Sequence, residues 1–158
     1  MQLRTARIAG ALYLLSAVAA GLPLIYVSTK LIVPDDAAKT AGNILASEAS
    51  LRACMVSELI GAITFIFLVR ALYQLLGEVS KTQASLMVIL VLISVPITFL
   101  NVLNEVAALR LLHGNSFLGV VNGAQRDALA LFFLNLHGDG VSLANICGVF
   151  GCFPSARS

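Results

Sequence analysis

Polar side chains inside apolar segments are the residues of this sequence with the clearest potential for chemistry. Asn101, Asn104 and Glu105 interrupt the apolar segment 84–112. Asn104 and Glu105 follow Asn101 by three and four positions, so all three share one face of a helix. Ionisable residues at membrane depth are energetically costly and by default indicate function. This face is therefore the first half of a candidate intramembrane polar cluster.

The second half lies in the apolar segment 128–150. Asn135, His137 and Asp139 interrupt it at alternate positions. Asn135 and Asp139 share a helical face, whereas His137, two residues from each, points elsewhere. We expect Glu105 to face this segment and to meet Asp139, with His137 as an alternative, cationic partner for the acids.

Three functions fit such a cluster. In the first, the polar groups hydrogen-bond across helices, and the chain is a structural, assembly or sensory membrane subunit. In the second, Glu105 and Asp139 serve proton-coupled or small-solute transport. In the third, the chain is an intramembrane metal-dependent hydrolase. We favour the first function and keep the other two as alternatives.

The hydrolase has the weakest support in the sequence. A catalytic zinc usually has three protein ligands, among which histidine is prominent. This chain has two histidines, and His113 falls in a predicted loop. Neither the zinc-protease pattern HExxH nor the serine-hydrolase pattern GxSxG occurs. We therefore predict no catalytic residues, no metal site and no cofactor.

Long uncharged stretches predict the elements that position these residues. There are 22 residues without a charge between Arg7 and Lys30, and 23 between Lys81 and Glu105. About 20 apolar residues span the hydrocarbon core of a bilayer. The sequence predicts an all-α, polytopic helical membrane bundle in a single domain, 1–158. Its four transmembrane helices are expected near 8–27, 53–76, 84–112 and 128–150.

Two further predictions concern the last apolar segment and the polar connection before segment 53–76. Asp139 and its polar neighbours offset most of the apolar residues of segment 128–150, so this helix should need its neighbours to insert. The polar connection before segment 53–76 should contain a short surface helix near 35–49. Asp35 is expected to cap its start, and Ile44, Leu45 and Leu51 to form its apolar face.

Composition excludes several other classes of protein. Apolar residues make up 59% of the chain, charged residues 11%, and the mean hydropathy is +0.94. A formal net charge of +2 without a basic run argues against a nucleic-acid partner. Three cysteines without metal-type spacing are expected to pack as small apolar residues. The expected location is the cell (inner or plasma) membrane, with lipid as partner and a homo-oligomer or unidentified membrane partner left open.

Several segments of the chain resemble a known family in wording and order. They read ARIAGALYLLSAVAAGLPLIYV, DAAKTAGNILASEASLRACMVSELIGAITFIFLVRALYQLL, SLMVILVLISVPITFLNVLNEVAAL and LALFFLNLHGDG. Over about residues 5 to 146 the chain is similar to bacterial membrane proteins of domain of unknown function family 4386. The resemblance implies a multi-pass inner-membrane protein without an established activity, and it supplies no site residues.

The end of the chain departs from that family. Members generally continue for about two more apolar segments and read something like WGLWLFPLG where this chain reads CGVFGCFPSARS. The codons that encode this stretch permit the family-like wording in a shifted reading frame. We therefore predict that the chain is C-terminally truncated and that residues 147–158 are a frame-shifted tail.

Overall fold

The computed structural model describes residues 2–77, 79–114 and 121–152, with side chains described from 3 to 145, and most of these residues are helical. No strand occurs among them. The elements are α1 (Gln2–Tyr26), which continues into a π-helical turn (Val27–Leu31), α2 (Ala37–Ala46), α3 (Glu48–Leu76), α4 (Lys81–Leu112) and α5 (Gly123–Cys152). The predicted all-α class is confirmed. The predicted frame-shifted tail, 147–158, lies outside the described side chains.

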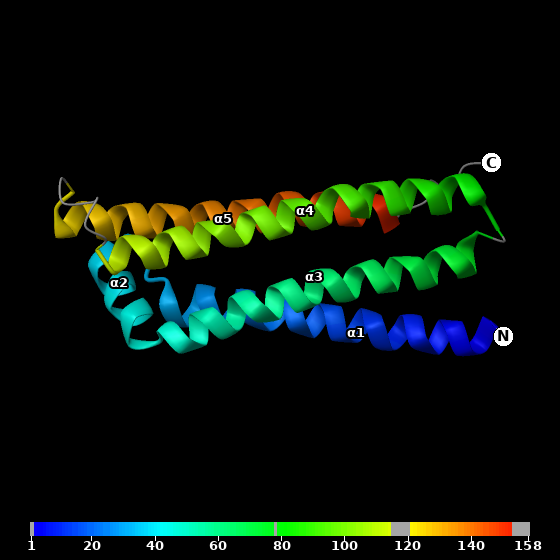
Figure 1. Cartoon of the computed structure of the whole chain (residues 1–158), viewed down its shortest axis with the longest axis horizontal. Helices are drawn as coiled ribbons and strands as arrows, with labels where there is room; N and C mark the ends of the chain where they lie inside the picture. The colour runs from blue at the N-terminus through cyan, green and yellow to red at the C-terminus, as the bar shows by residue number, and fades with distance from the viewer. Residues whose placement is uncertain (1, 78, 115–120, 153–158) are drawn as a thin grey trace.

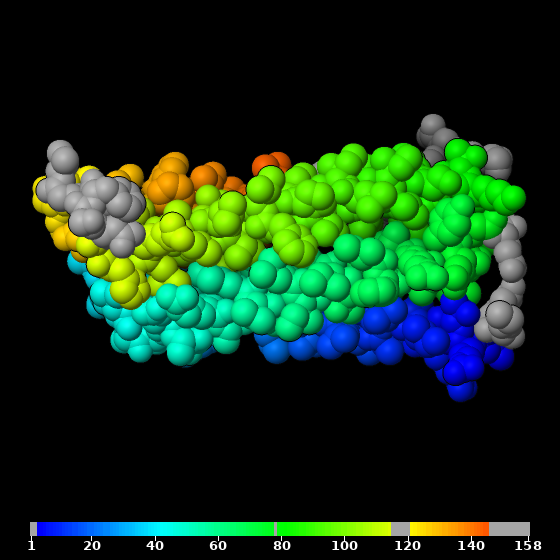
Figure 2. Space-filling model, viewed as in Figure 1, coloured from blue at the N-terminus to red at the C-terminus, as the bar shows by residue number. Residues whose placement is uncertain are grey.

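The long helices form an elongated bundle made of two pairs. α1 packs on α3 and α4 packs on α5, and the two pairs meet along α3 and α4 (Figure 1). α3 and α4 lie side by side over much of one face, with α1 along its lower edge (Figure 2). α2 covers one end of the bundle, where its fully buried Ile44 joins a core with Leu51 and Leu134. At this end, α2, α3 and α5 share one apolar core.

Three helices are long and apolar enough to cross a membrane. They span Leu3–Leu31, Glu48–Leu76 and Lys81–Leu112, and an 18-residue stretch within each has a mean hydropathy of 2.0, 2.0 and 2.6, respectively. Over its described residues α5 is not among them, so the prediction of four such helices is one too many. The physical reason is the polar content of α5, since Asn135, His137 and Asp139 fall in its middle third.

Each long helix begins before its predicted start because polar residues extend it by a turn or more. Ser80 accepts a hydrogen bond from the Gln83 amide at 3.4 Å and caps α4. Asn122 and Gln125 form a reciprocal capping box before α5, with bonds of 3.1 and 2.9 Å. Apolarity marks the membrane-buried part of a helix, whereas capping residues mark its end.

The predicted surface helix exists, but its details differ from the prediction. Asp36, not Asp35, caps it by accepting from the Lys39 amide at 2.9 Å. Asp35 instead forms the preceding turn with a φ of 62°. Of the expected apolar face, Ile44 and Leu51 are fully buried, but Leu45 is 48% exposed. The face turned to the bundle therefore contains Thr40, Ala41 and Ile44.

Candidate functional site

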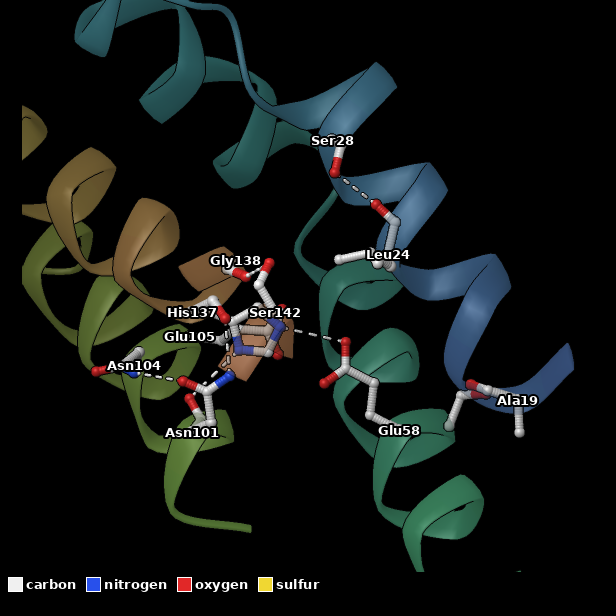
Figure 3. Close-up of polar contacts among 11 residues, drawn as sticks. Ala19, Leu24, Ser28, Glu58, Asn101, Asn104, Glu105, His137, Gly138 and Ser142 are labelled. Carbon is white, nitrogen blue, oxygen red and sulfur yellow. Dashed lines mark hydrogen bonds and ion pairs between the residues drawn. The ribbon is translucent and has the colours of Figure 1, made fainter. Parts of the chain in front are cut away.

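Three ionisable side chains from three helices meet inside the bundle. Glu58 comes from α3, Glu105 from α4 and His137 from α5, and their exposed fractions are 5%, 0% and 3%. The Nε2 atom of His137 lies 3.4 Å from Glu58 Oε1 and 3.9 Å from Glu105 Oε1. One donor atom from each residue lies within 4.8 Å of the others. We call these three residues the acid–histidine cluster; Figure 3 shows the Glu58 and His137 side chains directed at each other.

Helical periodicity places each member of this cluster on an inward face. His137 follows buried Ala130 and Leu134 by seven and three positions. Glu105 follows buried Asn101 by four positions, and Glu58 follows buried Met55 by three. These are the spacings at which side chains share one side of a helix. The packing that builds the apolar core therefore also carries the three polar groups inward.

A reciprocal pair of hydrogen bonds between α4 and α5 fixes the orientation of His137. The Asn101 side-chain amide donates to the His137 carbonyl at 2.8 Å, and His137 Nδ1 lies 3.3 Å from the Asn101 carbonyl. Asn104 in turn donates to the Asn101 side-chain oxygen at 2.9 Å. Because a carbonyl only accepts, Nδ1 is the nitrogen that carries a proton here. Nε2 is thereby directed at the two carboxylates.

Gly140 leaves the space that Asn101 occupies. A Cβ at this position would lie 2.6 Å from Asn101 Cγ and 2.8 Å from its amide nitrogen. Asn101 cannot move away without losing its bonds to His137 and Asn104. A glycine is therefore required here by close packing against the residue that orients His137.

Glu105 is the least satisfied member of the cluster. Neither of its carboxylate oxygens has a hydrogen-bond partner among the described residues, although the side chain is fully buried. A buried charge without compensation costs several kcal/mol. The 3.9 Å separation from His137 is too long for a hydrogen bond. The carboxylate form of Glu105 is therefore stable here only when a proton or another cation balances its charge.

A cavity of about 250 Å³ adjoins the cluster. Glu58 and Asn101 line this cavity. The cavity therefore touches one acid of the cluster and the residue that orients His137. Four of the five α-helices contribute to it, with polar groups from Ser16, Ser94, Thr98 and Asn145 among apolar ones from Leu24 and Phe65. It provides room for a small molecule or for water beside the buried Glu58 carboxylate.

The six residues of the predicted cluster separate into two groups. Asn101, Asn104, Glu105 and His137 come together in the bundle, and Glu105 faces α5 as expected. Asn135 and Asp139 are exposed on the other side of α5. The expected meeting of Glu105 with Asp139 is therefore wrong, and His137 takes that place. Residues two positions apart do not share a helical face, so His137 and Asp139 point in different directions.

Glu58 is the site residue that the sequence analysis did not include. The sequence does mark Glu58 as unusual, since it is an acid inside an apolar segment. Its position near one end of the predicted helix 53–76 was equally compatible with the membrane interface. The structure begins α3 at Glu48 and buries Glu58 about three turns inside. Only contacts between helices distinguish these two environments.

The other histidine belongs to a surface arrangement at the α2 end of the bundle. His113 Nε2 lies 3.1 Å from Glu48, whose carboxylate also contacts Arg52 at 2.7 Å. His113 ends α4, where its Nδ1 lies 2.8 Å from the Leu109 carbonyl. This pair ties the start of α3 to the end of α4. It does not contribute to the acid–histidine cluster.

Comparison with known proteins places the chain in a family. The sequence profile of the family described as domain of unknown function (DUF4386) matches residues 8–157. The match covers nearly the whole chain, so the chain belongs to this family. No curated protein and no solved structure matches it significantly.

Proposed function

We propose that this protein binds a small cation inside its helical bundle and transports it across the membrane. The observation that carries the proposal is the acid–histidine cluster, in which two buried carboxylates face a single imidazole. With both acids ionised and His137 neutral, the cluster has two negative charges in a medium of low dielectric. A cation is the species that such a site attracts most strongly.

A purely structural role explains only part of the cluster. Asn101, Asn104 and the backbone of His137 bond across helices, as expected of groups that hold a bundle together. Glu105 makes no such bond among the described residues. Its carboxylate adds a desolvation cost without adding a contact. A function that uses this charge accounts for it, whereas a bundle-stabilising role does not.

The surroundings of the cluster support passage of a solute as well as binding. The adjoining cavity is lined by the three transmembrane-type helices α1, α3 and α4 together with α5, and its hydroxyl and amide groups can replace part of the hydration shell of a cation. α1, α3 and α4 are long enough to cross the bilayer, and we place the protein in the cell membrane as a multi-pass protein. In such a setting, an intramembrane acid marks an ion pathway.

Reconstitution of the purified chain into lipid vesicles tests this proposal. Vesicles containing dyes for H⁺, Na⁺, K⁺ or Zn²⁺ should show protein-dependent uptake of at least one cation. Glu58→Gln and Glu105→Gln should each abolish that uptake. Asp139→Asn, which removes an exposed acid from α5, should leave it intact. The proposal fails if no cation enters, or if the Asp139 variant alone loses uptake.

A further inference from the structure

We infer that the acid–histidine cluster is a binding site for a divalent transition-metal ion of the zinc type, coordinated by Glu58, Glu105 and His137. This inference names the cation of the proposed transport function and rests on that function only for the movement of the ion. Binding itself follows from the donor atoms, from their separations and from the hydrogen bonds that hold them in place.

The donor set selects the class of metal. An imidazole nitrogen with two carboxylate oxygens suits zinc, manganese, iron and cobalt. Calcium and magnesium instead prefer sites made of oxygen donors alone. Three protein donors also leave at least one coordination position free, as in sites that exchange a ligand. His137 is therefore the residue that makes this a transition-metal site.

The separations within the cluster fit an ion better than a hydrogen bond. A charge-assisted N–H···O bond is about 2.7–2.9 Å long, but His137 Nε2 lies 3.4 Å from Glu58 Oε1. Donors about 2.1 Å from a tetrahedral metal are roughly 3.4 Å apart from each other. The second separation, 3.9 Å to Glu105 Oε1, needs about half an ångström of contraction. Rotation of the unbonded Glu105 carboxylate can supply it.

The environment of His137 prepares it to bind a metal. Its Nδ1 faces the Asn101 carbonyl at 3.3 Å, which holds the proton on Nδ1 and presents the Nε2 lone pair to the acids. Metal-bound histidines almost always have such a partner on their second nitrogen. Two carboxylates that face a neutral imidazole need a positive species, either a proton or a metal ion, to balance their charge. The unpartnered Glu105 oxygens point to the same requirement.

Other ligand-type groups among the described residues are separate from this site. Cys54 lies one turn before Glu58 but is not among the donors that lie within 4.8 Å of one another. His113 and Glu48 form an exposed pair at the end of the bundle, with two donors rather than three. That pair could take up metal weakly at the surface. It therefore defines the control that the binding experiment needs.

Zinc binding to the purified chain, residues 1–158, in detergent is the decisive measurement. After chelator treatment and dialysis, wild type should bind one Zn²⁺ per chain by calorimetry and by elemental analysis. Glu58→Gln, Glu105→Gln and His137→Gln should each weaken binding by roughly 100-fold or more, beyond the 10–100-fold typical of residues outside the first coordination shell. Co²⁺ should give visible absorption bands that these three variants lose.

Matched variants separate this site from non-specific uptake. His113→Gln, Glu48→Gln and Asp139→Asn each remove a ligand-type group outside the cluster and should bind zinc as wild type does. Circular dichroism checks that every variant keeps its helices. The inference is overturned if wild type binds no zinc, if Mg²⁺ or Ca²⁺ binds equally well, or if His113→Gln rather than His137→Gln abolishes binding.

Different experimental results would refute the metal site and the transport function. Stoichiometric zinc binding without vesicle uptake would leave the site in place and refute transport. Uptake of another cation by a chain that binds no zinc would support transport and refute the metal site.

Discussion

Glu105 is a buried acid that we expect to lower the stability of the metal-free protein. It is fully buried, and its oxygens have no hydrogen-bond partner among the described residues. Removing one partner of a satisfied buried ion pair usually destabilises a protein by several kcal/mol. Removing a charge that has no partner should have the opposite effect. The two cases can be distinguished by stability measurements without any assay of function.

We predict that Glu105→Gln raises the thermal stability of the metal-free protein in detergent, by on the order of 1 kcal/mol. The same substitution should remove the stabilisation that zinc gives to wild type, because a ligand that binds only the folded state stabilises it by mass action. Thermal melts with and without Zn²⁺ measure both effects. A metal-free variant less stable than wild type would mean that Glu105 has a structural partner.

Gly140 and Gly138 provide a matched test of the support around His137. A Cβ at Gly140 would overlap the Asn101 side chain, whereas nothing lies within 4 Å of a Cβ at Gly138. Gly140→Ala should destabilise the protein by about 1–3 kcal/mol, because Asn101 must give up hydrogen bonds or α5 must shift. It should also weaken zinc binding by about 10-fold.

The control substitution, Gly138→Ala, should be neutral or stabilising by up to about 1 kcal/mol, because alanine has a higher helix propensity than glycine. Chemical or thermal unfolding, together with zinc titration, checks both variants. Equal behaviour of the two would contradict the role given to Asn101 in orienting the histidine.

At the scale of elements, α2 depends on a cap that differs by one residue from the one predicted. Asp36→Ala should destabilise the protein by about 1 kcal/mol, because the Lys39 amide loses its acceptor. Asp35→Gly should be neutral or slightly stabilising, since Asp35 has a φ of 62°, which glycine adopts without strain. Unfolding midpoints of the two variants measure the difference. A larger loss in the Asp35 variant would place the cap at Asp35 instead.

The helical elements themselves were largely predictable. Long uncharged stretches located α1 and α4, and apolar composition located α3, because hydrocarbon excludes charge and makes every backbone group bond within its helix. The boundaries were less accurate because Ser80, Asn122 and Gln125 extend α4 and α5 through polar residues. Such capping bonds depend on local side-chain geometry, which hydropathy does not record.

At the scale of the whole molecule, α5 occupies the bundle through its contacts rather than its own hydropathy. It packs along α4 and carries His137 to the two acids of the cluster. We predict that segment 128–150, tested alone in a membrane-insertion assay, inserts in about half of the chains or fewer, since its apolar gain and polar cost nearly cancel. The segment should insert fully when α4 precedes it. Efficient insertion of the isolated segment would contradict this dependence.

The sequence by itself determined the class of protein and the residues with chemical potential. Apolar length dictated long helices, and helical spacing put Asn101, Asn104 and Glu105 on one face, because both depend only on local chain geometry. Which helix meets that face was decided by the tertiary structure. The rotation of α5 selected His137 over Asp139, and the packing of α3 brought in Glu58. Helix rotation and depth are set by contacts summed over many side chains from distant segments, and a single sequence does not encode these as a readable pattern.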